Sequence, residues 1–253
     1  RHGVLAQSPM LDHVGTFANH LADLALLTEP LIGFDARDQG TRPTARPDLR
    51  ATLEADWPLA PNFAFVRTPV WERAEEDTRA AFAELVEALG ERVREVALPE
   101  AFADAHRCHG VIMEADIALS FAPLYERGRD QLSDTLRGII ERGQGHRALD
   151  YLEAKRRARH LAALLEPIFE QHDAILTPAA PGTAPVGLAA TGSPIFCTIW
   201  TLLGMPAVTL PLLEGANGLP MGVQLVGARG DDARLLRHAR WLLRRLGGNE
   251  EES

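Results

Sequence analysis

The clearest periodic pattern in the chain lies between residues 78 and 89, where apolar side chains recur every three or four positions. This spacing places them on one face of an amphipathic helix. Acidic residues fill its first turn, where the helix dipole favours negative charge, and Gly90 ends it. Short aromatic and β-branched runs at 63–66 and 93–98 flank the helix. The resulting β-α-β unit predicts an α/β fold.

The rest of the chain is predicted to alternate helices with short strands. The segment 33–61 is rich in Asp, Arg, Pro and Gly and is predicted mostly as loop, whereas 99–172 is predicted to be almost wholly helical. Further helices are predicted over 17–27, 49–54 and 195–203, with a last one starting at Asp231-Asp232; strands are predicted over 174–177, 207–212 and 221–226, the last two joined by a tight turn through Gly215 and Gly218.

Composition narrows the class of protein. Of the 253 residues, 46% are hydrophobic and 24% charged, which is an ordinary globular balance. The formal net charge of −9 argues against an exposed nucleic-acid surface. No apolar run approaches the ~20 residues that a membrane-spanning helix needs. Two cysteines cannot form a disulfide framework. We therefore predict a cytoplasmic protein without nucleic-acid or membrane partners.

Hydroxyl nucleophiles find little support in the residues alone. The chain has five serines: Ser8, Ser120, Ser133, Ser193 and Ser253. None lies in a G-x-S-x-G turn, and none has a glycine-rich neighbourhood that could supply an oxyanion hole. The single lysine, Lys155, stands among arginines, as on a solvated helix face. These features predict no catalytic residue in this chain.

A histidine-rich stretch suggests metal chemistry, but its spacing is unfavourable. His106, Cys108, His109 and Glu114 lie close in sequence. On a helix His106 and His109 share a face while Cys108 points elsewhere. No second ligand pair follows at zinc-site spacing. We predict neither a metal nor a cofactor site, and we expect Cys197, within an apolar run, to be an inert buried thiol.

Three ordered motifs carry more information than any single residue. The first is GVLAQSPMLDHVG at 3–15, followed by ADLALL at 22–27. The second is DAILTPAAP at 173–181. The third is WTLLGMPAVTLP at 200–211, which continues as GLPMGVQLVG at 218–227. In this order they resemble the second half of the amidase signature family, and the resemblance covers nearly the whole chain.

The resemblance implies a single large α/β domain with a mixed sheet wrapped by helices, of which residues 1–246 would form the carboxy-terminal part. The polar tail 247–253 is predicted to be disordered. Family members cleave or transfer amides through a nucleophilic serine, a bridging serine in a cis peptide and a lysine base. The segments that carry them precede the part that this chain matches, so we expect the catalytic triad to lie outside it. Asp12 corresponds to an acidic residue for which we predict a structural role.

The same resemblance implies which residues meet the substrate. The predicted helix 195–203 corresponds to the region that lines the family's substrate pocket, which makes Ser193, Phe196 and Trp200 candidate substrate-binding residues. The alternative that Phe196 and Trp200 are simply core residues stays open. Pro194 stands near the place where members acting on misacylated tRNA carry an acidic residue, which favours a small-molecule amidase.

These observations predict that the parent protein hydrolyses carbon–nitrogen bonds of small carboxamides and that this chain alone is inactive. Two alternatives remain: the A subunit of an aminoacyl-tRNA amidotransferase, and a non-enzymatic truncated remnant. The identity of the amide is left open. A homodimer of the full-length form also remains open.

Overall fold

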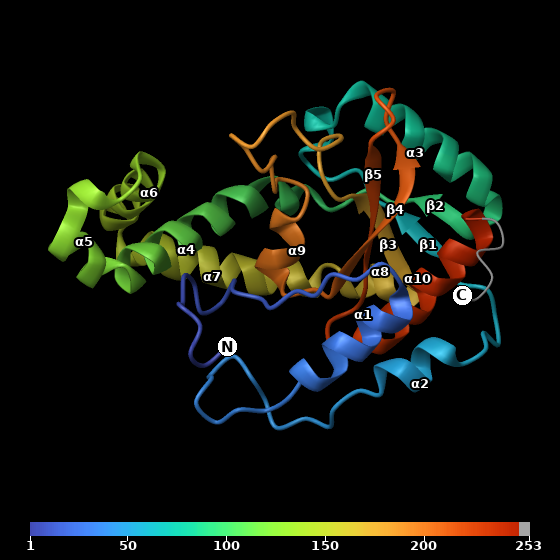
Figure 1. Ribbon diagram of the computed structural model, residues 1–253, viewed down its shortest axis with the longest axis horizontal. Coiled ribbons are helices and arrows are strands. Elements are labelled where there is room, and N and C mark those ends of the chain that lie inside the picture. Colours follow the sequence, from blue (N-terminus) through green and yellow to red (C-terminus); the bar gives the residue numbers. More distant parts are fainter. Residues whose placement is uncertain (248–253) are drawn as a thin grey trace.

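Among the residues that the structure describes, five strands form one mixed sheet in the order β2-β1-β3-β5-β4, with helices on both of its faces (Figure 1). The computed structural model describes residues 1–247. The strands are β1 (Phe63–Phe65), β2 (Val93–Glu95), β3 (Ala174–Pro178), β4 (Ala207–Glu214) and β5 (Pro220–Val226). The predicted α/β class and the mixed sheet flanked by helices are both confirmed.

Ten α-helices accompany the sheet in the described part of the chain. They are α1 (Leu21–Thr28), α2 (Leu49–Glu54), α3 (Glu76–Leu89), α4 (Ala105–Ser120), α5 (Ala122–Gly128), α6 (Asp134–Gly145), α7 (Ala148–Ala163), α8 (Glu166–Gln171), α9 (Thr198–Leu203) and α10 (Asp232–Leu246). Short 3₁₀ turns lie at Glu29–Leu31, Trp71–Arg73, Gly90–Arg92, Glu100–Asp104 and Arg129–Gln131. The almost wholly helical stretch predicted over 99–172 is confirmed.

The predicted β-α-β unit is present, with β1 and β2 parallel and Phe63 opposite Val93. The predicted strand 93–98 is shorter in the structure and ends at Glu95. Val96 donates one more hydrogen bond to the Phe65 carbonyl, at 2.9 Å. Beyond it the chain runs toward a proline, which has no N–H to donate, so the ladder stops.

β3 is the central strand, and all five of its residues are buried. It runs parallel to β1 on one side and antiparallel to β5 on the other. Its side chains alternate between the two faces: Ile175 joins one core cluster, while Ala174 and Leu176 join the other. A strand covered on both faces is expected to be continuously apolar, as this one nearly is.

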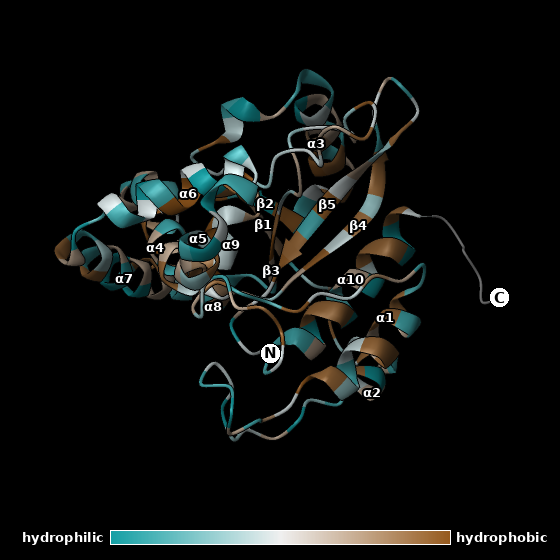
Figure 2. Ribbon diagram, turned by 60° about the vertical axis from the view of Figure 1, so that its left-hand side comes forward, coloured by the Kyte–Doolittle hydropathy of each residue, from teal (hydrophilic) through white to brown (hydrophobic). Residues whose placement is uncertain are grey.

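Each face of the sheet has its own helices. The first cluster packs Ile112 of α4, Leu161 of α7 and Trp200 of α9 against the sheet. The second packs Phe82 of α3 and Leu236 of α10, together with residues of α1 and α2. Figure 2 shows apolar residues along the strands, and both apolar and polar residues on α1, α2 and α10. A smaller third cluster joins α4, α5 and α6 at the end of α4 distant from the sheet (Figure 1).

Two predicted helices start too early. The helix predicted over 17–27 begins at Leu21, because His20 is extended and the residues before it follow the surface, with Phe17 95% exposed. The helix predicted over 195–203 begins at Thr198, because the preceding residues form a turn that Cys197 closes on the Pro194 carbonyl. Apolar composition alone does not mark either start.

Three further predictions concern the start of α10, the carboxy-terminal tail and membrane-spanning helices. Asp231 holds the predicted N-cap position of α10, yet its side chain makes no capping hydrogen bond. The predicted disordered tail lies, apart from Gly247, outside the described residues. Within the described residues no helix is both long and apolar enough to cross a bilayer.

We predict that Gly143→Ala destabilises the fold by about 1–3 kcal/mol. Gly143 lies in α6 directly against α4, and an added Cβ would overlap the Glu114 carbonyl group and the Ala118 side chain. Gly145→Ala is the matched control, because no atom lies within 4 Å of the Cβ that it would add. Urea denaturation of both variants measures the difference. Equal stability of the two variants would contradict the close approach of α4 and α6.

We also predict that His238 makes the fold less stable in acid. The pKa of His238 is lowered, mainly by burial. Among the neighbouring charges, Asp173 and Asp231 raise this pKa, whereas Arg234 and Arg237 lower it. Its Nδ1 is enclosed without a hydrogen-bond partner. The unfolded chain therefore binds the proton more readily, so this contribution is complete above the unfolded pKa of about 6.5 and is lost as the pH falls below it.

The measurement is the free energy of unfolding at pH 7.5 and pH 5.5. His238→Gln is expected to reduce the loss between these values, whereas the exposed His160→Gln is expected to leave it unchanged. A pH dependence that is the same in wild type and His238→Gln would show that another group is responsible.

Candidate functional site

A cavity of about 600 Å³ lies where the amino-terminal segment, α9, α10 and the β4–β5 pair meet. Its lining includes residues 13–18 from the segment that precedes α1. The other side is formed by Cys197, Trp200 and Thr201 around α9, by Ala207, Val208 and Thr209 of β4, by Gln224 of β5, and by Asp232, Leu235 and Leu236 of α10. The volume lies within the range typical of sites for small molecules, about 300–1,000 Å³.

The corner between α9 and β4 fixes one wall of this cavity. Gly204 ends α9 in the left-handed conformation, with φ of 63°, which glycine adopts without steric cost. The N–H of Met205 then donates to the Trp200 carbonyl at 3.0 Å, and the guanidinium of Arg229 donates to the Leu203 carbonyl. These bonds satisfy the last carbonyls of α9 and hold Trp200 in place beside β4.

The three predicted pocket residues take different positions. Trp200 lines the cavity and is 1% exposed, so it is also part of the core. Phe196 is equally buried but lies outside the cavity lining. Ser193 is exposed in the loop before α9 and does not line the cavity either. Substrate binding by Ser193, Phe196 and Trp200 stays a prediction, and the geometry brings only Trp200 to the cavity.

Sequence reasoning missed Gln224, the polar residue of the β5 floor. It is 2% exposed and stands opposite Thr209 of β4 and Thr177 of β3. Its Nε2 donates to the Pro178 carbonyl at 3.1 Å. The only signal in the sequence is a single amide within the apolar run of the motif at 221–226. A buried polar residue in such a run is more informative than the apolar residues around it.

Cys197 is the thiol beside Gln224. Its Sγ donates to the Ala179 carbonyl at 3.3 Å. Burial raises the pKa of the Cys197 thiol, and a hydrogen bond from Gln224 opposes that effect. A thiol in such surroundings stays protonated near neutral pH. Cys197 is therefore a packing residue of the cavity wall and not a nucleophile.

Charge at the cavity is sparse. Among the residues that line it, Asp232 is the one carboxylate and His13 the one basic side chain. Burial, followed by the neighbouring charge of Asp231, raises the pKa of Asp232. The cavity is therefore suited to a neutral ligand with few polar atoms.

A buried polar network holds the amino-terminal loop against the helices. The Ser8 hydroxyl donates to Asp116 of α4 at 2.5 Å, and the Tyr151 hydroxyl of α7 donates to the same carboxylate at 2.8 Å. Burial and then the bond to Asp116 raise the pKa of Tyr151 to about 12. Lys155, which the sequence places on a solvated face, is instead half-buried over the Tyr151 ring, 5.0 Å from its centroid.

Asp12 shapes the loop that this network anchors. Its carboxylate accepts hydrogen bonds from the backbone N–H groups of Gln7 and Ser8, at 2.9 and 3.1 Å. Such bonds tie a carboxylate to its own loop, as in other side-chain-closed turns. The contacts are those of a residue that sets loop geometry.

The histidine-rich stretch is dispersed over α4. His106 contacts the Ile195 carbonyl through Nε2 at 2.9 Å, whereas Cys108 is buried. Glu114 pairs with Arg142 at 2.6 Å and with His146 at 2.8 Å. In the part of the chain that the structure describes, no three His, Cys, Asp or Glu side chains gather as a metal site.

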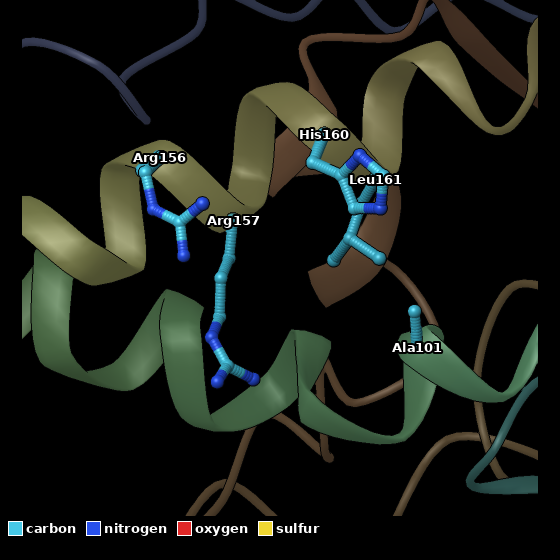
Figure 3. Close-up of a pocket in the computed structure, with 5 residues that line it drawn as sticks. All are labelled: Ala101, Arg156, Arg157, His160 and Leu161. Atoms are coloured by element: carbon cyan, nitrogen blue, oxygen red, sulfur yellow. The ribbon is translucent and has the colours of Figure 1, made fainter.

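A second hollow, of about 270 Å³, lies between α7 and the turn that precedes α4. Figure 3 shows Arg156, Arg157 and His160 of α7 around it, with Arg157 extending toward α4. Both arginines are ion-paired with Glu153, and Arg157 also pairs with Asp104. Since these charges are already compensated, the hollow is a poor anion site.

Known proteins resemble this chain over almost its whole length. Residues 1–236 match the family model described as Amidase. The A subunit of the glutamyl-tRNA(Gln) amidotransferase of Thermus thermophilus is 32% identical, over 94% of this chain and 56% of that protein. Its counterpart from Cupriavidus necator is 30% identical, over 98% of this chain and 60% of that protein. The chain thus spans less than two thirds of the length of these curated relatives.

Solved structures agree on the fold. A crystal structure of an amidase matches with a TM-score of 0.79 and 27% identity, over 97% of this chain and 55% of that one. A structure from a vestigial complex related to an s-triazine catabolic enzyme matches with a TM-score of 0.85. At 21% identity, over 98% of this chain and 56% of that one, the second likeness supports the fold alone.

We predict that Asp116→Ala destabilises the protein by about 2–3 kcal/mol, because it leaves the buried Ser8 hydroxyl and the half-buried Tyr151 hydroxyl without this acceptor. Asp130→Ala, which removes a carboxylate that is 94% exposed, is expected to change stability by less than about 1 kcal/mol. Chemical denaturation gives both values. Hydrogen exchange of the amides at 7–12 should also accelerate in Asp116→Ala, and unchanged protection there would contradict the anchoring role.

Proposed function

The chain belongs to the amidase family, and on that premise we propose that it is part of an enzyme that hydrolyses the carbon–nitrogen bond of small carboxamides. In this proposal the chain supplies one wall and the floor of the substrate pocket. The nucleophilic serine and its base come from outside residues 1–253. No metal and no organic cofactor is needed. A nucleic acid or a membrane is not among the proposed partners.

The observation that carries this proposal is the character of the cavity. Its walls are largely apolar, with Trp200, Met205 and Leu24 among them, and a few fixed polar groups stand between them. Among residues 1–247, no lysine, arginine or serine contributes to its lining. A small neutral amide matches such a site in size and polarity, because an apolar group can meet the walls while the amide meets the fixed polar atoms.

The described serines support an external nucleophile. Ser8 is 1% exposed and already bonded to Asp116. Ser133 accepts a hydrogen bond from the N–H of Leu136 as the N-cap of α6. Ser120 donates to the Gln7 carbonyl at 3.2 Å, and Ser193 is exposed. A serine nucleophile requires an adjacent base and aimed N–H donors, and none of these four has them.

A second candidate function is that of an amidotransferase acting on glutamyl-tRNA(Gln). It is favoured by the names of the curated relatives with 30–32% identity. It is disfavoured by the formal net charge of −9, since binding of a polyanion generally uses a basic surface. Pro194 stands near the place where family members acting on misacylated tRNA carry an acidic residue, which also disfavours this activity.

We predict that the purified chain does not hydrolyse acetamide or benzamide, whereas a hybrid that joins it to the part of the crystallised amidase outside the matched region does. Loss of a serine-based triad removes several orders of magnitude in rate, so the two preparations should differ by at least about 10³-fold. Ammonia release measures this directly. The same hybrid is assayed for conversion of glutamyl-tRNA(Gln) to glutaminyl-tRNA(Gln).

The outcomes separate the alternatives. Turnover by the chain alone that disappears in Ser133→Ala or Ser193→Ala would place the nucleophile inside it and overturn the proposal. Amidation of tRNA without hydrolysis of small amides would support the transferase. A folded hybrid without either activity would support a non-enzymatic remnant.

In an active hybrid, Trp200→Ala is predicted to change the ratio of kcat/KM for benzamide and acetamide by about tenfold or more, because a large apolar wall binds the larger acyl group. Phe196→Ala, which removes an equally buried ring outside the cavity lining, is the matched control. If both variants change the two substrates by one common factor, Trp200 acts only as a core residue.

A further inference from the structure

Gln224 combines burial, a fixed orientation and a place at the cavity floor. Its side chain is 2% exposed, in the central part of β5. Antiparallel pairing places Thr209 and Thr177 on either side of it. Because directly opposed residues of paired strands project to the same face, these three form a short polar row on one face of β3, β5 and β4. The row crosses the face that carries Trp200.

The amide nitrogen of Gln224 is committed to the protein. One N–H donates to the Pro178 carbonyl at 3.1 Å. Cys197, which also lines the cavity, has a thiol whose pKa burial raises and a hydrogen bond from Gln224 lowers. The bond to Pro178 uses the donor end of the carboxamide. A carboxamide has its two donor protons on nitrogen and its acceptor on oxygen. The oxygen is therefore the end that is left for a ligand.

The acceptor end is open. Among residues 1–247 no donor pairs with Oε1 of Gln224, and this oxygen is not among the enclosed atoms that lack a partner. It therefore borders the cavity that Gln224 lines. A residue that only braced β3 against β5 would not need such an acceptor, whereas a ligand N–H would satisfy it.

We propose that Gln224 binds substrate, its Oε1 accepting a hydrogen bond from the N–H of the carboxamide and so selecting amides over esters and carboxylates. The inference rests on the proposed function for the identity of the ligand class. An ester has no N–H to donate, and a carboxylate would place one acceptor against another. The single carboxylate of the cavity, Asp232, adds to the discrimination against anionic ligands.

The test measures binding to the chain itself, and so does not depend on turnover. Benzamide, N,N-dimethylbenzamide and methyl benzoate have similar aromatic groups, but only benzamide donates an N–H. We expect benzamide to bind about fivefold to tenfold more tightly than the other two, in line with one hydrogen bond of about 1 kcal/mol. Two-dimensional NMR of the ¹⁵N-labelled chain gives the affinities, and the Gln224 side-chain resonances should move with benzamide.

Gln224→Met keeps the length of the side chain and removes the acceptor. It is expected to weaken benzamide to the level of N,N-dimethylbenzamide while leaving methyl benzoate unchanged. Gln144→Met, the same substitution at an exposed position outside the cavity lining, is the matched control and should preserve the preference. The spectra of both variants report folding, and if Gln224→Met fails to fold, the contrast among the three ligands in the wild type decides.

Equal affinity of the wild type for benzamide and N,N-dimethylbenzamide, or no binding of any of the three ligands to the folded chain, overturns the inference. These results are distinguishable from a failure of the proposed function. A preference for benzamide that depends on Gln224, together with an inactive hybrid, refutes only the hydrolase. An active hybrid whose preference for amides over esters survives Gln224→Met refutes only the role of Gln224.

Discussion

The sheet depends on β3, which joins its parallel part, through β1, to its antiparallel part, through β5. The strand must pair in parallel with β1 and antiparallel with β5 while both of its faces are covered by helices. Burial of the backbone requires that its N–H and C=O groups find partners on both edges. The side chains must at the same time satisfy two separate cores, which explains why Ile175 and Leu176 belong to different clusters. Neither half of the sheet is complete without this strand.

The candidate site follows from that arrangement. The floor is the β4–β5 pair, whose position is set by β5 binding to β3, and Gln224 is oriented by a carbonyl at the end of β3. The opposite wall is the segment 13–18, which follows the loop anchored by Ser8 on Asp116. The cavity is thus shaped by two attachments far apart in sequence. Rigid elements carry the Trp200 wall and the Gln224 floor, as precise recognition of a small ligand requires.

The elements that were predicted well from the sequence are those that a local hydrophobic pattern determines. The spacing of Phe82 and Leu85 gave α3, and the neighbouring apolar runs gave the strands around it. The ordered motifs pointed to the family and to the region of Trp200. Local pattern did not reveal the Ser8–Asp116 bond, which joins residues 108 positions apart, or the bond from Gln224 to Pro178 of another strand. The early start predicted for α9 has a similar cause, since a turn at Pro194 and a helix share the same apolar composition.

The strand order also has a consequence for how the chain acquires its structure. Only α3 and a short turn separate β1 from β2 in the sequence. The other edge of β1 pairs with β3, which follows all the helices from α4 to α8. Pairings over such a separation close slowly, because the entropy of a long loop is lost before any contact compensates for it. During synthesis the β1–α3–β2 unit therefore emerges with an open apolar edge. Until β3 has been made, that unpaired edge is a site at which misassembly can begin.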